Sequence, residues 1–264
     1  MGQDFPRGVL GFDIAAPIAV GILFAGLWQA AVQWYELPPY LLPSPLLIAE
    51  TLVTDFPTLF PSWLFTLKIT VLAFLAAAIG GLGLSLLLTS SRSLERSLFP
   101  YAVILQVTPI VAIAPLIIIW AKDTTLALLI CAWIVAFFPV VSNTMTGLNS
   151  ADPNLRDLFA LYGASKWQTM LWLRLPSALP YYLAGLRISG GLALIGAVVA
   201  EFVAGTGGTE SGLAYRILES AYRLRIPRVF AALALISITG LAIFAALSFI
   251  SDRLLRHWRE SSKP

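Results

Sequence analysis

Six long runs of apolar residues, each nearly free of charge, dominate this chain. Residues 14–35, for example, contain no Asp, Glu, Lys or Arg. A helix of about 20 apolar residues crosses the roughly 30 Å hydrocarbon layer of a bilayer. Within that layer the backbone must satisfy its own hydrogen bonds, as a helix does. The runs therefore predict an all-α membrane protein.

The composition excludes other broad classes. Hydrophobic residues make up 58% of the chain and charged residues 12%, whereas soluble domains have about 45–50% and about 25%. A disordered chain needs low hydrophobicity and high charge. The basic residues have a simple interpretation as loops that face an anionic leaflet, so no nucleic-acid partner is expected.

The run boundaries predict six transmembrane helices in one membrane domain, residues 1–264. We expect them at residues 14–35, 69–88, 98–120, 126–146, 179–203 and 229–250. The third run contains Pro100, Pro109 and Pro115, so it cannot form a straight helix. Short amphipathic helices are expected at residues 46–54 and 212–224. The longest polar stretch between spans, residues 149–176, joins spans four and five.

Lys and Arg in the loops predict the orientation. With the N-terminus inside, the inner loops carry about twice as many basic residues as the outer loops. Both termini are therefore expected in the cytoplasm. The basic segment before the last span reduces this bias.

The inner loop at residues 149–176 has an unusual pattern. It predicts a short helix, a break at Gly163, a second helix that exposes Lys166 and Trp167, and a Leu-x-Leu-Pro stop at Pro176. We expect three apolar side chains of this loop to pack inward, those of Leu158, Leu161 and Leu171. An apolar knob ringed by charge suits docking onto another protein. The alternative is a solvated loop with an ordinary helix break.

The spacing in this loop resembles the EAA loop of permease subunits of bacterial ABC importers. That pattern has an acidic residue, two alanines, a glycine six residues after the acid, and Ile-x-Leu-Pro after nine more. Asp157, Gly163 and Leu173 with Leu175-Pro176 occupy the matching positions. Leu158 and Phe159 replace the two alanines, which is a departure from the pattern.

The resemblance extends over nearly the whole chain. Permeases of the nitrate, sulfonate, taurine and thiamine-precursor subgroup have similar segments to residues 42–45 (Leu-Pro-Ser-Pro), Thr108-Pro109, residues 114–116 (Ala-Pro-Leu) and residues 200–202 (Ala-Glu-Phe). Where that subgroup often has Trp-Phe-Gly, this chain has Trp-Ala-Lys at residues 120–122. The outer turn there is expected to differ in shape.

The resemblance implies the fold and partners of a type I ABC importer permease. Two permease copies would form the pore, two cytoplasmic ATPase subunits would each bind one inner loop, and a periplasmic or lipid-anchored protein would deliver solute, at the bacterial cytoplasmic membrane. The solute would be a small anion such as nitrate, sulfonate or bicarbonate, or a small heterocycle such as a pyrimidine thiamine precursor. The implied ATPase-coupling residues are Arg156, Asp157, Ala160, Gly163, Ala164, Ser165, Lys166, Trp167, Leu175 and Pro176.

ATP is expected to bind elsewhere. The chain has no G-x-x-x-x-G-K-[ST] phosphate loop, so ATP and Mg²⁺ would be held by the partner ATPase. The glycine-rich residues 205–208 lack the lysine and are interpreted as a turn.

Polar residues within the spans are candidates for the solute path. Gln106 and Thr108 adjoin Pro109, and irregular backbone at membrane depth is tolerated where it lines a cavity or is buried in protein. Hydrogen bonding that repairs the kink explains them equally well, and similar alternatives hold for Ser142 and Asn143. Two charged residues lie in the fifth span, Arg187 and Glu201. Arg187 is a candidate for closing an inner gate or attracting an anion, and the alternative is that its side chain extends to the lipid headgroups. Glu201 is a candidate for a functional group at the outer mouth, and the alternative is that it is solvated at the membrane interface.

Two other function classes remain as alternatives. A stand-alone secondary carrier or channel would be expected to hold acidic groups deep in the bundle, and Glu201 is shallow. A membrane enzyme or metal protein needs clustered nucleophiles, bases or ligands. Cys131 and His257 are the only cysteine and histidine and lie far apart in sequence, so we expect no catalytic residue and no metal site on this chain.

Overall fold

The structure, a computed structural model, describes residues 8–205 and 211–256, and the side chains of residues 8–14 are outside that description. Every regular element in the described part is helical, which confirms the all-α class. The predicted turn at residues 206–208 and the isolated His257 lie outside the described residues. The helices are α1 (Gly8–Trp34), α2 (Pro45–Thr54), α3 (Phe56–Ser90), α4 (Arg92–Val107), α5 (Ile110–Ala121), α6 (Thr124–Asn149), α7 (Pro153–Leu161), α8 (Lys166–Thr169), the π-turn η1 (Met170–Arg174), α9 (Leu175–Ala204), α10 (Leu213–Tyr222) and α11 (Ile226–Leu254).

Five of the described helices are long and apolar enough to cross a membrane, and a sixth span forms if α4 and α5 are taken together. The prolines of the third run break it as predicted, and the two halves meet at 101° at Thr108 and Pro109. The third span is therefore a bent pair, with the backbone at the break in extended conformation. The predicted amphipathic helices correspond to α2 and α10.

The second span is longer than predicted. Helix α3 begins at Phe56 and has 35 residues, whereas the sequence predicted that this span begins at residue 69. Pro57 lies in the first turn, where the missing N–H has no helical partner to lose. The loop expected at residues 89–97 is correspondingly reduced to Ser91, which caps α4.

Local sequence explains several helix ends. Ser44 caps α2 by accepting from the Leu47 N–H at 3.3 Å, and Pro45 follows it. Lys122 ends α5 in the left-handed region at φ 56°. Asp123 then caps α6 by accepting from the N–H groups of Thr125 and Leu126. The turn predicted from Lys122 and Asp123 is thus formed by one helix stop and one helix start.

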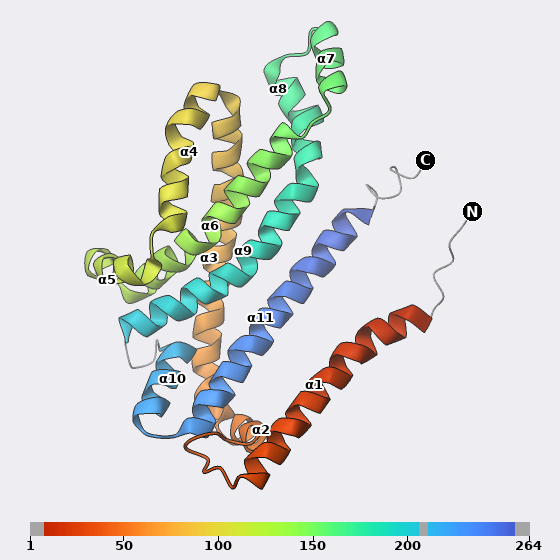
Figure 1. Ribbon diagram of the computed structural model, residues 1–264. Helices are drawn as coiled ribbons and strands as arrows, with labels where there is room; N and C mark the ends of the chain where they lie inside the picture. The colour runs from red at the N-terminus through yellow and green to blue at the C-terminus, as the bar shows by residue number, and fades with distance from the viewer. Residues whose placement is uncertain (1–7, 206–210, 257–264) are drawn as a thin grey trace.

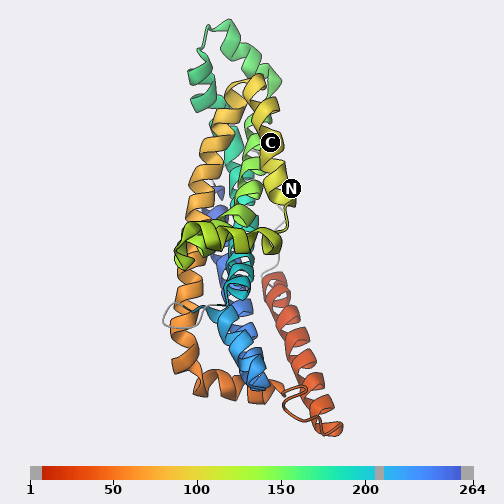
Figure 2. The same cartoon turned by 90° about the vertical axis from the view of Figure 1, so that its left-hand side faces the viewer.

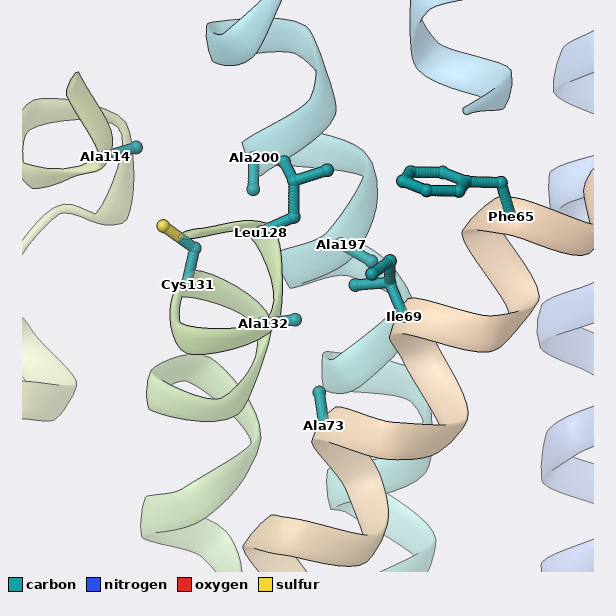
Figure 3. Close-up of a cluster of buried hydrophobic side chains, with 9 residues drawn as sticks. All are labelled: Phe65, Ile69, Ala73, Ala114, Leu128, Cys131, Ala132, Ala197 and Ala200. Atoms are coloured by element: carbon teal, nitrogen blue, oxygen red, sulfur yellow. The ribbon is translucent and has the colours of Figure 1, made fainter. Parts of the chain in front are cut away.

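The core lies where α3, α6 and α9 meet. Figure 3 shows Ile69 of α3, Ala132 of α6 and Ala197 of α9 facing the space between the three helices, and all three are fully buried. Small residues let α6 and α9 approach closely. A Cβ added at Gly196 would lie 2.9 Å from the Ala132 Cα, too near for a real side chain.

The helices divide the molecule into two ends. Figures 1 and 2 show α7 and α8 projecting at one end, while α2 and α10 lie at the other. The N-terminal end of α1 and the C-terminal end of α11 both point toward the end that carries α7 and α8. Helix α1 lies at the flank of the bundle, where Trp28 contacts Phe230 of α11 at 6.0 Å between ring centroids.

Candidate functional site

The predicted inner loop forms two short helices that extend beyond the bundle (Figure 1). Helix α7 starts with Asp152, whose carboxylate accepts from the Asn154 N–H at 2.8 Å, and with Pro153 in the first turn. Both are standard helix-start features. The first helix of the loop is therefore defined by its own sequence.

Gly163 ends α7 through a Schellman motif. Its φ is +69°, in the left-handed region that glycine adopts most easily. The Gly163 N–H donates to the Ala160 carbonyl at 3.0 Å, and the Ala164 N–H donates to the Phe159 carbonyl at 2.9 Å. This is the paired bonding of a Schellman C-cap. The break that the sequence predicted at Gly163 is confirmed.

The second helix starts at a capping box. The Ser165 hydroxyl accepts from the Gln168 N–H at 3.2 Å, and the Gln168 side chain accepts from the Ser165 N–H at 2.7 Å. The predicted stop at Pro176 is wrong, because α8 continues through η1 into α9 and the helical segment runs from Lys166 to Ala204. The π-turn widens the helix just before Pro176, where a proline ring disrupts ordinary i→i−4 bonding; the Leu175 N–H instead bonds to the Met170 carbonyl.

Arg174 fastens the base of the loop to the bundle, a role that sequence reasoning missed. Its guanidinium donates to the Leu148 carbonyl at 2.8 Å, the Asn149 side-chain oxygen at 2.7 Å and the Thr89 carbonyl at 3.3 Å. The acceptors lie at the C-terminal ends of α6 and α3, where carbonyls lack helical partners and attract a cation. The signal for this role was an Arg next to the membrane boundary, but its partners Leu148 and Thr89 are 26 and 85 residues away.

The apolar side chains of the loop are exposed, contrary to the inward packing predicted for them. Leu161 is 84% exposed, Leu158 44% and Leu171 38%. Leu161 lies at the end of α7, which projects past the bundle, so it is the least covered of the three. Tyr162 and Trp167 are exposed as well, at 84% and 69%. Soluble surfaces rarely expose large apolar groups in such a cluster, so the loop has the composition of a protein-docking surface.

A groove of about 670 Å³ lies between the C-terminal end of α3 and the two loop helices. Six of the ten predicted coupling residues line it: Arg156, Ala160, Ala164, Lys166, Trp167 and Leu175. Asp157, Gly163, Ser165 and Pro176 are not among its lining residues. Gly163 and Ser165 instead form the backbone framework that holds the groove open.

The break between α4 and α5 forms a second hollow, of about 380 Å³. Gln106 and Thr108 both line it, with Pro139 of α6 and Leu192 of α9. The Thr108 hydroxyl donates to the Ile104 carbonyl at 2.6 Å, whereas Gln106 is exposed. The kink-repair role thus applies to Thr108, and Gln106 is an exposed residue at the lining of the hollow. We call this hollow the break pocket.

Ser142 and Asn143 lie on α6 and are partly buried. The Asn143 amide donates to the Pro139 carbonyl at 2.8 Å, and the Ser142 carbonyl accepts from the Thr146 hydroxyl. Neither residue lines the break pocket. The Asn143 bond stabilises the helix at Pro139. For this residue the contacts therefore agree with the helix-repair alternative rather than with a place in the solute path.

Arg187 pairs with Asp252 of α11. The guanidinium Nη2 lies 3.2 Å from the Asp252 carboxylate, with the two side chains 31% and 57% exposed. The same nitrogen donates to the Ser248 carbonyl at 3.4 Å. The two charged residues are 65 positions apart, so no local pattern indicated the pair.

Glu201 is buried rather than solvated at an outer mouth, which corrects the interfacial alternative. Its side chain is held by Thr66 of α3 and by the backbone of α10, and the residue is 3% exposed. It joins three helices and does not line the break pocket. No group of three or more His, Cys, Asp or Glu that could hold a metal occurs among the described residues.

Comparison with known proteins decides the family. Residues 77–259 match the family described as binding-protein-dependent transport system inner membrane component. The chain belongs to this family. The match includes α7 to α9, the break pocket and part of α3, so the site described above lies within the family domain.

Relatives of this permease match along nearly their full length. It is 34% identical to the formylaminopyrimidine transport permease protein ThiX of Halalkalibacterium halodurans, over 94% of this chain and 98% of that protein. It is 32% identical to the riboflavin transport system permease protein RibX of Chloroflexus aurantiacus, over 98% and 94%. A putative aliphatic sulfonates transport permease protein of Bacillus subtilis is 29% identical over 89% and 84%. The predicted subgroup and the assignment as a transport component rather than an enzyme are confirmed.

A solved structure has the same fold. The crystal structure of an amino acid ABC transporter with histidines contains a chain with a TM-score of 0.64, which covers 77% of the permease and 97% of that chain at 20% identity. This likeness confirms the type I permease fold.

Proposed function

We propose that this permease forms the solute path of an ATP-driven importer as a homodimer, with one cytoplasmic ATPase subunit bound to each α7–α8 loop. The observation that carries the proposal is the exposed apolar surface of Leu161, Tyr162 and Trp167 on a loop whose backbone is fixed by two caps, a Schellman motif and Arg174. A rigid surface loses little conformational entropy on binding. Such a loop suits the transmission of force better than a mobile one.

The remaining parts of the assembly follow from this arrangement. The loop faces the cytoplasm, and both termini lie on the same side, in agreement with the charge bias of the loops. ATP and Mg²⁺ are held by the ATPase, because the sequence has no phosphate loop of its own. An extracytoplasmic binding protein delivers solute at the end that carries α2 and α10.

Copurification with the ATPase tests the docking surface. Tyr162→Asp places a charge next to Leu161 among the exposed apolar residues of the loop and is expected to reduce the ATPase retained by about tenfold or more, as loss of an interface anchor does. Tyr222→Asp is the matched control: Tyr222 is 86% exposed, against 84% for Tyr162, and lies at the end of α10. Equal ATPase retention by the two variants would refute the docking assignment. Solute uptake by the permease alone in liposomes would indicate a stand-alone carrier.

For the solute, we propose a small uncharged heterocycle rather than an anion. The residues that line the break pocket are apolar or neutral, with Gln106 and Thr108 as the polar side chains. Arg187, the cation in the fifth span that suited an anion, already has a carboxylate partner in Asp252. A planar heterocycle needs apolar contact and a few well-placed polar groups, which this pocket offers.

Uptake measurements test the solute class. In cells that express the complete transporter, the accumulation of two heterocycles, formylaminopyrimidine and riboflavin, is compared with the accumulation of two anions, nitrate and an aliphatic sulfonate. We expect accumulation of a heterocycle that Gln106→Ala reduces about tenfold, since an amide–ligand bond that is lost costs about 1–2 kcal/mol. Accumulation of nitrate or sulfonate with Gln106→Ala unchanged would contradict the proposal.

A further inference from the structure

Helix α10 has no N-cap of its own. Its N-cap position is Gly212, which has no side chain to accept from the first N–H groups. The Leu213 N–H instead donates to the Thr66 hydroxyl at 2.9 Å, and the Ala214 N–H donates to the Glu201 carboxylate at 3.1 Å. The start of α10 is therefore capped by α3 and α9.

The Glu201 carboxylate depends on the same contacts. The Thr66 hydroxyl donates to its other oxygen at 2.8 Å, and the residue is 3% exposed. Within residues 8–205 and 211–256 no ion pair involves Glu201. A buried carboxyl group that is not hydrogen-bonded is costly, and a helix N-terminus favours a carboxylate. Glu201 and α10 thus stabilise each other.

Gly212 makes the contact possible. A Cβ added at Gly212 would overlap the Glu201 carboxyl group, so any other residue would displace that carboxyl group from the start of α10. We call the set of Thr66, Glu201 and the α10 start at Gly212, Leu213 and Ala214 the α10 latch.

Other contacts hold α10 in the fold when the latch is weakened. The Arg216 guanidinium donates to the Ser62 hydroxyl at 2.9 Å. Ile217 belongs to a buried apolar cluster with Leu59 of α3 and Leu235 of α11. Loss of the latch is therefore expected to let α10, Ile217 included, leave its seat more often without unfolding the bundle.

The latch lies at the end of α9 opposite to the α7–α8 loop (Figure 1). We infer that Glu201 is a positioning residue for transport: it keeps α10 seated on α3 and α9 throughout the cycle, so that α10 moves with the end of α9 as one unit. Movement of the loop helices would thereby be carried to the extracytoplasmic end of the pore. This inference relies on the proposed function for the cycle, but the seating of α10 is independent of it.

Cysteine labelling of the purified transporter in nanodiscs measures the seating. Ile217 is 7% exposed, so the thiol introduced by Ile217→Cys is protected from a bulky maleimide while α10 is seated. Native Cys131 is fully buried and contributes little background. Glu201→Ala is expected to raise the labelling rate of the introduced thiol about tenfold, the factor for loss of one hydrogen bond to a charged group. The thiol of Tyr222→Cys, at a position that is already exposed, is expected to keep its rate.

A conservative pair separates the latch from general destabilisation. Thr66→Val removes the hydroxyl at nearly the same volume, and Thr66→Ser keeps it. In the Ile217→Cys background, we expect faster labelling when Thr66→Val is added and a nearly unchanged rate when Thr66→Ser is added. Unchanged labelling with both Glu201→Ala and Thr66→Val would overturn the latch.

Vanadate trapping tests movement as one unit. In a transporter that carries Ile217→Cys alone, the introduced thiol is expected to label at the same slow rate with and without ATP and vanadate. Faster labelling on trapping would show that α10 leaves its seat and would overturn the inference. If no ATPase copurifies, the proposed function fails, while the nucleotide-free comparison of Glu201→Ala still decides the seating of α10.

Discussion

At the scale of single residues, the contact between α6 and α9 depends on the absence of side chains. Gly196 meets the Ala132 backbone, whereas Gly191, on the same helix, has nothing within 4 Å of an added Cβ. Close backbone approach is the usual means of helix association in membranes, where the hydrophobic effect gives little.

The two glycines provide a matched pair of variants. Gly196→Ala is expected to lower the free energy of unfolding by about 1–3 kcal/mol, because the new methyl group overpacks the α6–α9 contact. Gly191→Ala is expected to leave stability unchanged or slightly raised, since alanine favours the helix. Apparent melting temperatures in detergent compare the two. A Gly196→Ala variant as stable as Gly191→Ala would show that α6 and α9 do not approach so closely.

Residue pairs distant in sequence were not predictable. Arg187 and Glu201 were recognised as unusual because charged groups are costly in a membrane. Their partners are Asp252, 65 residues away, and Thr66, 135 residues away. A single sequence contains no periodic or spacing signal for such contacts, so it indicated the two residues and could not assign their roles.

At the scale of elements, the junction between the loop and α9 is held by one side chain. Arg174→Lys keeps the charge but cannot reproduce the planar fork that reaches Leu148, Asn149 and Thr89. We expect hydrogen exchange in residues 148–152 and 170–175 to become about tenfold faster, as loss of one or two hydrogen bonds predicts. Arg156→Lys, on the exposed face of α7, is the control and should leave exchange in these segments unchanged. Equal exchange in both variants would argue against this anchor.

Element existence was largely predictable from sequence, and element boundaries were not. Apolar runs located the five long helices and the broken third span, because length and hydropathy suffice for that. The start of α3 at Phe56 was missed because the predicted span was limited to the apolar run from residue 69, whereas the helix begins with Pro57 in its first turn, where proline is tolerated. The prolines indicated that the helices are disturbed near Pro109 and Pro176, but they did not predict a 101° bend at the first site or a continuous helix with a π-turn at the second.

At the scale of the whole molecule, α9 connects two chemically different ends. The docking loop exposes aromatic and aliphatic groups, whereas the α10 latch buries a carboxylate among hydroxyl and N–H donors. The sequence predicted which residues belong to the loop, because a polar stretch, a glycine and the spacing to Leu175-Pro176 are local signals. The prediction that Leu161 packs inward is wrong. An apolar residue on a short helix does not indicate whether the surface that covers it belongs to the same chain or to another protein.

The central claim is that an ATPase binds the α7–α8 loop of this permease. Labelling at Leu161, which is exposed in the free chain, tests this claim most directly. The Leu161→Cys variant is labelled by a maleimide with and without the purified ATPase, and the Tyr222→Cys variant serves as the reference at the other end of the molecule. The account predicts that the ATPase strongly protects the thiol at position 161 and does not protect the thiol at position 222. Equal labelling of the Leu161→Cys variant with and without a bound ATPase would contradict it.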